Sequence, residues 1–248
     1  MTITTDLPTP ASAMAVAAHP DDVEFGCGGT LAKWASEGCR ILHVVCTDGS
    51  KGSWDPAQDT EQLVARRVEE QRAAARALGG DGDVVFLGGT DGELDPSRAT
   101  QWLLAQWIRR LKPEVVLGHD PWKRYRLHPD HRAAGFLLTD SVVAARDPHF
   151  FPEQLGGEEG LAPHRPERML LWEADEADHV EDITGSFDKK IEALLCHRSQ
   201  LVTTMDIDDA TNVAQAEAFV DKMRLRCSDH GALAGVALGE SFKLLSRL

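Results

Sequence analysis

Four short apolar runs, each followed by an amphipathic stretch, dominate the first two-thirds of the chain. Their length and composition are typical of buried strands: 13–18, 40–46, 83–87 and 114–118. Four strand–helix units in succession predict a mostly parallel sheet that helices cover on both faces. We therefore expect an α/β fold, a Rossmann-like three-layer domain.

Residue composition and the positions of glycine predict where the helices between these strands begin and end. A helix over 29–38 ends at Gly38, and a helix over 61–80 is rich in alanine, glutamate and arginine and stops at a glycine pair. A fourth helix begins near residue 129. The third presents one buried stripe, formed by Leu104, Trp107, Ile108 and Leu111.

The pattern loosens after the fourth helix. The segment 148–167 is rich in proline and glycine and is expected to be a surface excursion. No internal repeat or linker divides the chain, so we expect residues 13–248 to form a single catalytic domain. The later elements that the sequence predicts are a strand over 179–183, a helix over 188–201 and a helical stretch near 211–225.

Net charge and cysteine content indicate which classes of partner the protein can bind and in which cellular compartment it is expected. The formal net charge of −14 opposes binding to nucleic acid or to an anionic membrane, since both require a basic surface. No apolar run is long enough to span a bilayer, and residues 1–12 lack a secretion signal and are expected to be a flexible lead-in. The five cysteines include no Cys-x-x-Cys pair, which argues against disulfides and indicates a reducing cytoplasm.

The turn after the first strand contains more ionisable side chains than a strand-to-helix connection requires. His19, Asp21 and Asp22 precede the sequence GCGGTL, which lies where a dinucleotide-binding fingerprint would be found. Leu31 occupies the position of the third glycine that this fingerprint requires, and the two carboxylates would repel a pyrophosphate. We therefore reject nucleotide binding and expect the glycines to allow a tight turn and close packing on the sheet.

A second motif, HPDH at 128–131, nearly repeats the HPDD at 19–22. In each, proline suits the first position of a helix, and one turn would bring the first and fourth residues to the same side. Such residues can simply be caps that interact well with the helix dipole. However, the motifs follow the first and fourth strands, which are neighbours at the switch point of a sheet ordered 3-2-1-4-5. Two imidazoles and a carboxylate at that point form a common ligand set for catalytic zinc.

Motifs along nearly the whole chain make a family resemblance specific. AHPDD and HPDH are the discriminating pair, and other segments follow in the right order: TDG at 47–49, RVEEQRAAARALG at 67–79, DGEL at 91–94, DKKIEALLCHRSQ at 188–200 and GESFKLL at 239–245. The chain resembles the PIG-L/LmbE-like zinc deacetylases, which include N-acetylglucosaminyl-phosphatidylinositol de-N-acetylases and deacetylases of the mycothiol and bacillithiol pathways. It departs from many members at Val23, where they have glutamate, which leaves the metal set intact and the subfamily open.

The resemblance implies a role for most residues of the two motifs. It makes His19, Asp22 and His131 the zinc ligands, with ferrous iron as a metal that would fit the same set. It makes Asp21 the general base, and His128 the group that stabilises the oxyanion or protonates the leaving amine. These residue types suit the roles, because a carboxylate can accept a proton from water and a histidine can donate one near neutral pH.

Other polar residues lie near these motifs. Asp130 is expected either to orient a neighbouring imidazole or to pair with the helix dipole as an ordinary first-turn residue. Asp48, Arg67 and Asp91 lie in segments that the resemblance marks, and they are expected to bind the hydroxyls of a sugar. The remaining candidates are His43 and His119, which are expected to be structural, and His197 and Arg198, which are expected to contact either the site or a neighbouring subunit of a homo-oligomer.

The activity expected from the resemblance is removal of an N-acetyl group from an N-acetylated amino sugar. The substrate would be a GlcNAc-type glycoside or a related small conjugate, and the products would be acetate and a free amine. The acidic balance favours a neutral or cationic, hydroxyl-rich substrate. The alternatives are a non-catalytic metal- or sugar-binding module, and an amidase of thiol conjugates or of larger acyl groups.

Overall fold

One sheet runs through the computed structural model, which describes residues 3–157 and 160–248. Within these residues the strand order is β1-β7-β8-β6-β5-β2-β3-β4. The strands from β4 to β6 are parallel, and β8 lies antiparallel between β6 and β7. The strands are β1 Thr4–Thr5, β2 Ser12–Ala17, β3 Arg40–Thr47, β4 Val84–Gly89, β5 Val115–His119, β6 Arg168–Trp172, β7 His179–Asp182 and β8 Gly239–Ser246.

This topology confirms the expected Rossmann-like α/β fold. The four strands predicted first are β2, β3, β4 and β5, and with β6 they occupy the expected order 3-2-1-4-5. β2 therefore lies between β3 and β5, where the strand order reverses and a crevice opens at the carboxyl ends. The turns that follow β2 and β5 are thus brought together by the sheet.

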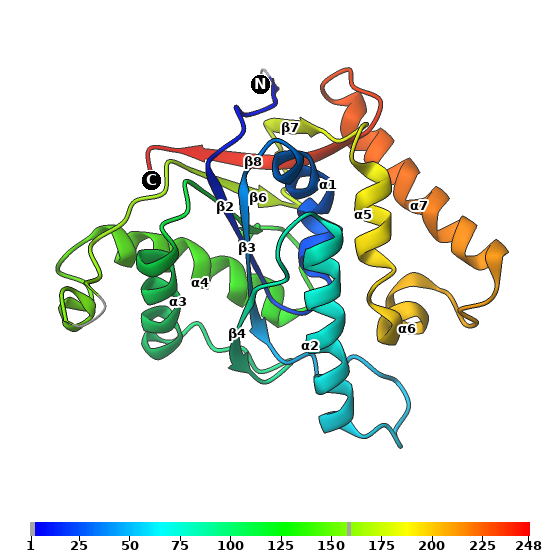
Figure 1. The fold of residues 1–248 in the computed structure, drawn as a ribbon, viewed down its shortest axis with the longest axis horizontal. Helices are drawn as coiled ribbons and strands as arrows, with labels where there is room; N and C mark the ends of the chain where they lie inside the picture. Colours follow the sequence, from blue (N-terminus) through cyan, green and yellow to red (C-terminus); the bar gives the residue numbers. More distant parts are fainter. Residues whose placement is uncertain (1–2, 158–159) are drawn as a thin grey trace.

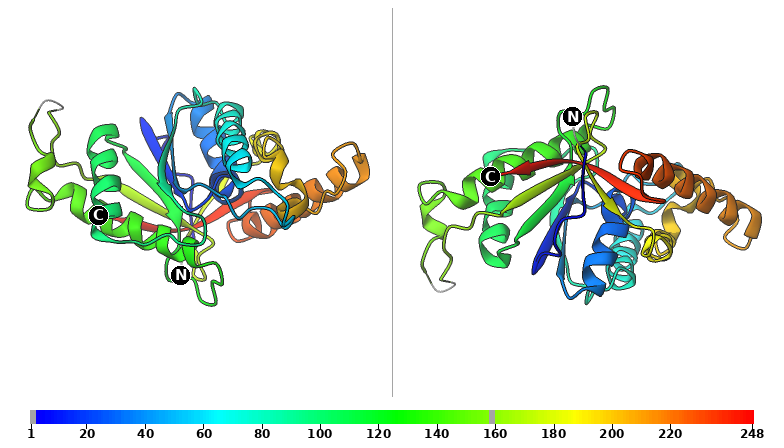
Figure 2. Two further views of the ribbon diagram at one scale, coloured as in Figure 1. Left: turned by 90° about the horizontal axis from the view of Figure 1, so that it is seen from below. Right: turned by 90° about the horizontal axis from the view of Figure 1, so that it is seen from above.

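Helices cover both faces of the sheet (Figure 1). Figure 2 shows α3 and α4 on one face and α1, α2 and α5 on the other, where α7 shares an apolar cluster with α5. Within the described ranges no helix has both the length and the hydropathy needed to cross a membrane. The helices are α1 Asp22–Ser36, α2 Thr60–Ala77, α3 Arg98–Leu111, α4 Pro129–Arg146, α5 Phe187–Leu194, α6 Leu201–Met205 and α7 Val213–Ala232, with 3₁₀ turns η1 Pro152–Gln154 and η2 Arg198–Gln200.

Alternating side chains of the central strands supply the two core layers. On β2, Met14 and Val16 join the cluster beneath α3 and α4, whereas Ala13 and Ala15 join the cluster beneath α1. All four are fully buried. The alanines leave room for α1 to lie close to the sheet, where it buries Leu31. Close packing of α1 holds the turn before it rigidly over the end of β2.

Several elements differ from the sequence expectation. α1 begins at Asp22, seven residues before the expected helix over 29–38, so its first turn includes part of the HPDD motif. The expected helix over 188–201 is divided into α5, η2 and the start of α6. β8, in the GESFKLL segment, was not expected as a strand, and it completes the sheet by pairing with two strands at once.

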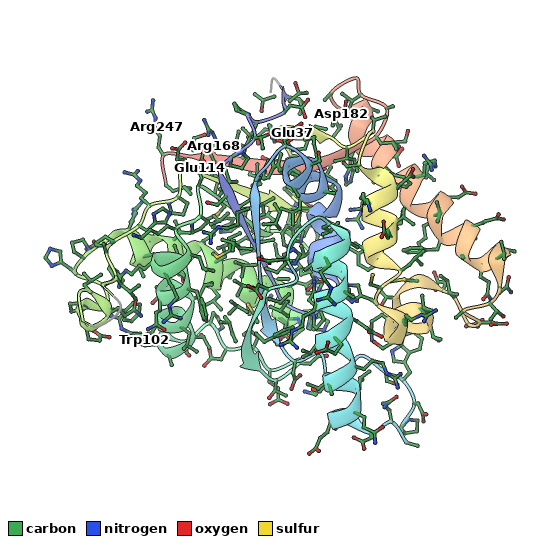
Figure 3. The ribbon with its side chains drawn as sticks, viewed as in Figure 1. Glu37, Trp102, Glu114, Arg168, Asp182 and Arg247 are labelled. Atoms are coloured by element: carbon green, nitrogen blue, oxygen red, sulfur yellow. The ribbon has the colours of Figure 1, made fainter. Side chains whose placement is uncertain are left out.

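Part of the N-terminal segment 1–12 contacts the sheet. Thr4–Thr5 pair in parallel with β7, and the N–H of Ala11 donates to Glu114 at 2.8 Å. Figure 3 labels Glu114, which lies just before the amino end of β5. It is therefore at the end of the strands opposite the crevice. These contacts join the expected lead-in to the domain.

A break inside α1 is bridged by a buried ion pair. Cys27 has non-helical backbone angles (φ −148°, ψ 19°), so helical hydrogen bonds are lost around it. Lys190 Nζ donates at 2.9 Å to two carbonyls before the break, and Glu240 accepts two backbone N–H groups beyond it, at 2.8 and 2.9 Å. The two side chains also pair with each other at 2.6 Å. The DKK and GES segments of the sequence therefore stabilise the helix that begins at the last residue of HPDD.

Replacing Lys190 by methionine is expected to destabilise the fold strongly. The substitution leaves the Glu240 carboxylate buried without its cation and leaves two carbonyls without a donor, and breaking a buried pair in this way costs about 3–5 kcal/mol. The free energy of unfolding, measured in urea, checks this. Lys189→Met is the matched control, because Lys189 is exposed and should change stability by less than about 0.5 kcal/mol. Equal stabilities of the two variants would contradict the bridging role.

Candidate active site

The turn after β2 brings His19 and Asp22 together without a helical turn. The Asp22 N–H faces the carbonyl of His19 at 3.4 Å, and the Asp22 carboxylate accepts the His19 N–H at 2.7 Å. Since α1 begins at Asp22, Pro20 precedes the helix instead of occupying its first position. Asp21 has φ 102°, a left-handed conformation that residues with a β-carbon rarely adopt. The expected helical geometry of HPDD is thus wrong, although its two ends do meet.

The start of α4 has the geometry expected for HPDH. Pro129 is the first helical residue, and ring Nδ1 of His128 accepts the N–H of Asp130 at 3.3 Å. The rings of His128 and His131 stack with their centroids 5.0 Å apart. Because β5 pairs with β2, His131 reaches Asp22, with Nε2 3.3 Å from Oδ1. The structure therefore gathers both motifs into one cluster.

Carboxylates face the His19 imidazole on both of its nitrogens. Nε2 lies 3.1 Å from Asp130 and 3.2 Å from Asp91, and Nδ1 lies 3.3 Å from Asp22. Burial acts to lower the pKa of His19, but hydrogen bonds to these three carboxylates raise it to about 12. The surroundings thus attract positive charge to Nδ1. A cation can replace that proton while Nε2–H stays on Asp130, as metal-bound histidines commonly arrange.

Asp130 is fully buried behind His19. Besides facing the imidazole, its carboxylate accepts the N–H of Gly92 at 2.6 Å and that of Leu94 at 3.1 Å. Burial would raise the pKa of Asp130, but hydrogen bonds from His19 and the two amides lower it to about 2. A permanently ionised carboxylate in this place can orient the imidazole and fix the 91–94 loop.

His119 belongs to the cluster, although the sequence reading treated it as structural. Its Nδ1 accepts the indole N–H of Trp172 at 3.0 Å, which places the ring proton on Nε2, 3.2 Å from Asp22. This imidazole therefore holds the carboxylate and offers no lone pair to a metal. Its position at the carboxyl end of β5, next to β2, is the signal that would have identified it.

Charge on Asp22 is stabilised by several rings. Burial opposes ionisation, but the imidazoles of His131 and His119 hold the pKa of Asp22 well below its usual value. For His131, burial is the main cause that lowers its pKa, to about 4. Arg126 lies 3.0 Å from Nδ1 of His131 and also pairs with Glu173. Because guanidinium only donates, His131 would hold a metal through Nε2 only with Nδ1 protonated, and so without the present contact to Arg126.

The donor atoms of this cluster suit a divalent metal ion. Ring nitrogens of His19, His128 and His131 all lie within 4.8 Å of one another, and the Asp22 carboxylate lies 3.3 Å from Nδ1 of His19 and 3.3 Å from Nε2 of His131. A mixture of imidazole nitrogen and carboxylate oxygen is typical of catalytic zinc and also suits ferrous iron. The buried His/Asp cluster is thus consistent with a metal site.

Asp21 lies beside the cluster and contacts a buried guanidinium. Arg67 Nη2 is 3.5 Å from Oδ2 of Asp21 and donates to the Pro20 carbonyl at 2.5 Å, while Nη1 donates to the Gly49 carbonyl at 3.0 Å. Burial raises the pKa of Asp21 to about 6, although the charge of Arg67 acts to lower it. Arg67 lines the cavity, but Nη2 is directed at the HPDD turn and Nη1 at the loop after β3.

The other two residues expected to bind sugar have different surroundings. Asp48 is absent from the cavity wall as the described residues form it, and its Oδ1 accepts the N–H groups of Ser50 at 2.9 Å and Asp91 at 3.1 Å. Asp91 does line the cavity, where one oxygen faces His19 and the other accepts the N–H of Lys51 at 3.0 Å. Asp48 therefore connects two loops, and Asp91 supports the imidazole from the wall.

A cavity of about 560 Å³ contains the cluster and extends well beyond it. Its outer wall includes the basic residues Lys51, Lys222 and Arg226, each paired with a carboxylate. Trp54, which is 80% exposed, and Phe25 add apolar surface. The wall therefore does not share the strongly acidic balance of the whole chain.

The three remaining sequence candidates, His197, Arg198 and His43, lie apart from this wall. His197 is fully buried and faces Glu24 at 3.2 Å, so it lies in the interior of the protein. Arg198, which begins η2, is exposed. His43 is buried as expected for a structural residue.

Comparison with known proteins gives a family match that includes both motifs. Residues 14–142 match the family model described as PIG-L, GlcNAc-PI de-N-acetylase. The diacetylchitobiose deacetylase of Thermococcus kodakarensis is 35% identical over 182 residues, covering 73% of this chain and 67% of that protein. The 4-oxalmesaconate hydratase of Pseudomonas putida is 34% identical over 200 residues, covering 76% of this chain and 74% of that one.

A solved structure extends the likeness to the whole fold. The N,N'-diacetylchitobiose deacetylase from Pyrococcus horikoshii superposes with a TM-score of 0.85 at 30% sequence identity. The superposition covers 97% of this chain and 87% of that chain. The likeness thus includes the α5–α7 region and β8, which lie beyond the residues that the family model matches.

Proposed function

Because this chain belongs to the PIG-L family of GlcNAc-PI de-N-acetylases, we propose that it hydrolyses the N-acetyl group of an N-acetylated amino sugar. The products are acetate and a free amine. The proposed substrate is a GlcNAc-type glycoside or a related small conjugate. The proposed cofactor is zinc, with ferrous iron as the alternative.

One observation carries this proposal. A single cavity holds the His19, Asp22 and His131 cluster, the Asp21 carboxylate beside it and the His128 ring at its rim. An amide hydrolase needs these three functions together, namely a cation site, a proton acceptor and a proton donor. A binding module would need the first alone.

We propose His19, Asp22 and His131 as the residues that hold the metal. His19 offers Nδ1 because Asp130 and Asp91 occupy its Nε2 side, and Asp22 offers a carboxylate that other rings keep ionised. Bound zinc supplies a Lewis acid that polarises the amide carbonyl and lowers the pKa of a water molecule towards about 7.

Asp21 is proposed to accept the proton of the attacking water. Its carboxylate lies in the cavity wall, where Oδ2 is 3.5 Å from Nη2 of Arg67. His128 is proposed to donate to the developing oxyanion or to the leaving amine. The N–H of Asp130 occupies its Nδ1, so the ring proton is on Nε2, and the side chain is 44% exposed at the rim.

A glycoside is expected to be a better substrate than free N-acetylglucosamine. The cavity volume of about 560 Å³ is in the range that holds drug-sized ligands, and Trp54 and Phe25 provide contacts beyond the reacting group. Binding of remote groups helps to position the amide and raises kcat/KM. The measurement is the rate of acetate release from N-acetylglucosamine, N,N'-diacetylchitobiose and aryl N-acetylglucosaminides. Each substrate is assayed with metal-depleted protein and with protein reloaded with zinc or iron.

The same panel tests the proposed activity itself. Activity that disappears with chelation and returns with zinc is expected. Full activity in a demonstrably metal-free sample would contradict the mechanism, and equal rates on sugar and glycosides would contradict the substrate expectation. With longer N-acyl glucosaminides added to the panel, faster release of the longer acyl groups than of acetate would instead favour the amidase alternative.

A hydratase is the second candidate function. A relative that covers three-quarters of this chain is a 4-oxalmesaconate hydratase, and the outer cavity wall carries Lys51, Lys222 and Arg226, which suit a carboxylate-bearing ligand. The test is whether the same metal-loaded protein consumes 4-oxalmesaconate, as measured by chromatography. The result distinguishes a hydratase from a deacetylase. Turnover of that compound without acetate release from any acetamide would favour hydration.

A further inference from the structure

We propose that Gln71, held by Glu24 and His197, is a positioning residue that fixes Asp21 in its reactive orientation. This inference rests on the proposed function, because it concerns the residue proposed to accept the proton. Gln71, Glu24 and His197 are fully buried and do not contribute to the cavity wall as the described residues form it. They can therefore act on the reaction only through Asp21 and its turn.

The backbone at Asp21 needs external support. Its φ of 102° lies outside the regions that residues with a β-carbon prefer, and such strain costs on the order of 1–3 kcal/mol. The side chain of Asp21 has a single polar contact among the described residues, to Arg67 at 3.5 Å, which is long for a hydrogen bond. A strained turn with one weak side-chain contact does not define the direction of a carboxylate by itself.

Gln71 supplies this support from α2. Its Oε1 accepts the backbone N–H of Asp21 at 2.9 Å, which fixes the orientation of the amide. Its Nε2 then points to Glu24 and donates to Oε1 at 2.9 Å. The side chain thus bridges the strained residue before α1 and the first turn of α1 itself.

Glu24 is held in turn by His197. Ring Nε2 of His197 lies 3.2 Å from Oε2 of Glu24, so both oxygens of this fully buried carboxylate have a partner. The chain of contacts runs from Asp21 through Gln71 and Glu24 to the segment after α5. These contacts also explain how the EEQ and CHRSQ segments, which lie more than a hundred residues apart in the sequence, act together in the structure.

Stability alone does not account for these residues. Nδ1 of His197 and Nε2 of His43, which lies beside Gln71, are buried and have no hydrogen-bond partner in the part of the chain that is described. Each buried polar group without a partner costs about 1–3 kcal/mol, and apolar side chains of similar shape would avoid that cost. A role in holding the site explains why polar residues are present here.

The central test is Gln71→Met, which keeps the volume of the side chain but removes both hydrogen bonds. We expect kcat for acetate release to fall about 10²-fold, since a misplacement of about 1 Å can have that effect. KM and zinc content should change little, because Gln71 touches neither the cavity nor the proposed ligands. A merely structural role would instead lower the unfolding free energy and leave kcat of the folded protein unchanged.

Gln154→Met is the matched control. Gln154 is also a buried glutamine with two hydrogen bonds, from Arg109 at 2.9 Å and to the Trp102 carbonyl at 2.8 Å, but it lies on η1 outside the cavity. This variant should lose stability and keep kcat. Equal loss of kcat in the two variants would overturn the inference, because general destabilisation would then explain both.

A swap of donor and acceptor provides the second test. Gln71→Glu places two carboxylates against each other, and it should lower kcat. Adding Glu24→Gln restores one carboxylate and one amide: the amide at position 24 donates to the carboxylate at position 71, which still accepts the N–H of Asp21, and the amide oxygen accepts from His197. We expect kcat of the double variant to recover at least tenfold over Gln71→Glu. Absence of recovery overturns the inference even where Gln71→Met does not fold.

The results also separate this inference from the proposed function. The wild type and Asp21→Asn are measured in the same assay. If the wild type releases acetate and Gln71→Met matches the kcat of Gln154→Met, the inference is wrong and the function stands. If Gln71→Met loses zinc together with activity, the inference is also wrong, because the residue then supports the ligands. If the wild type releases no acetate, both are overturned.

Discussion

Asp21→Asn is expected to keep its zinc and to lose about 10²–10⁴ in kcat, the usual contribution of a general base. The amide has nearly the shape of the carboxylate, and Asp21 is not among the proposed ligands, so no metal contact is removed. An amide cannot accept a proton from water at neutral pH. Metal content of the purified variant and kcat for acetate release check the two halves of this expectation.

The matched control for this variant is Asp120→Asn. Asp120 is a buried carboxylate at the carboxyl end of β5 that accepts the N–H of Trp122 at 2.9 Å, and it does not line the cavity that contains the cluster. Its kcat should stay close to that of the wild type. Near-normal turnover in Asp21→Asn would show that Asp21 is not the proton acceptor, and near-normal turnover in both Asp21→Asn and Asp22→Asn would show that HPDD has no catalytic role.

Asp22→Asn is expected to lose both metal and activity. The Asp22 carboxylate lies among His19, His119 and His131 at 3.2–3.3 Å, and an amide replaces one anionic oxygen with a nitrogen that repels a cation. Changes to residues that merely orient a ligand lower metal affinity about 10–100-fold, so loss of a ligand should exceed about 100-fold. Competition with a chromophoric chelator measures the affinity, and thermal unfolding shows whether the variant is folded.

The comparison of the two aspartate variants is decisive for their roles. If Asp21→Asn loses its metal while Asp22→Asn keeps it, the proposed roles are reversed. If both lose metal, the two carboxylates share one site, and the proton acceptor is another residue of the cavity. The two side chains are adjacent in the sequence, so only this pair of measurements distinguishes them.

The sequence determined the arrangement of the central sheet. Runs such as 13–18 and 114–118 have the length and composition of buried strands, and parallel strands joined by helices allow few orders. The order 3-2-1-4-5 then placed the turns after β2 and β5 at one crevice, and the structure has them there. This reasoning worked because it rests on local composition and on a chirality rule that applies to every such chain.

The same reasoning gave the wrong local geometry for HPDD. The spacing argument put the first and fourth residues of HPDD on one side of a helical turn, whereas in the structure Asp21 has a left-handed backbone and α1 begins only at Asp22. Backbone strain at one residue is not encoded in its own identity, because it persists only where surrounding contacts enforce it. His119 was misjudged for a similar reason, since its partners Trp172 and Asp22 come from other strands and turns.

Only the tertiary structure decided how the site is supported. Lys190 and Glu240 bridge the break in α1, and Gln71 and Glu24 link Asp21 to His197, although the members of each set are widely separated in the sequence. A buried polar side chain is stabilised by whichever partner the packed chain brings to it, and no periodicity or composition records that partner. The sequence therefore specified which side chains meet at the crevice, and the packing of distant segments specified how those side chains are held in position.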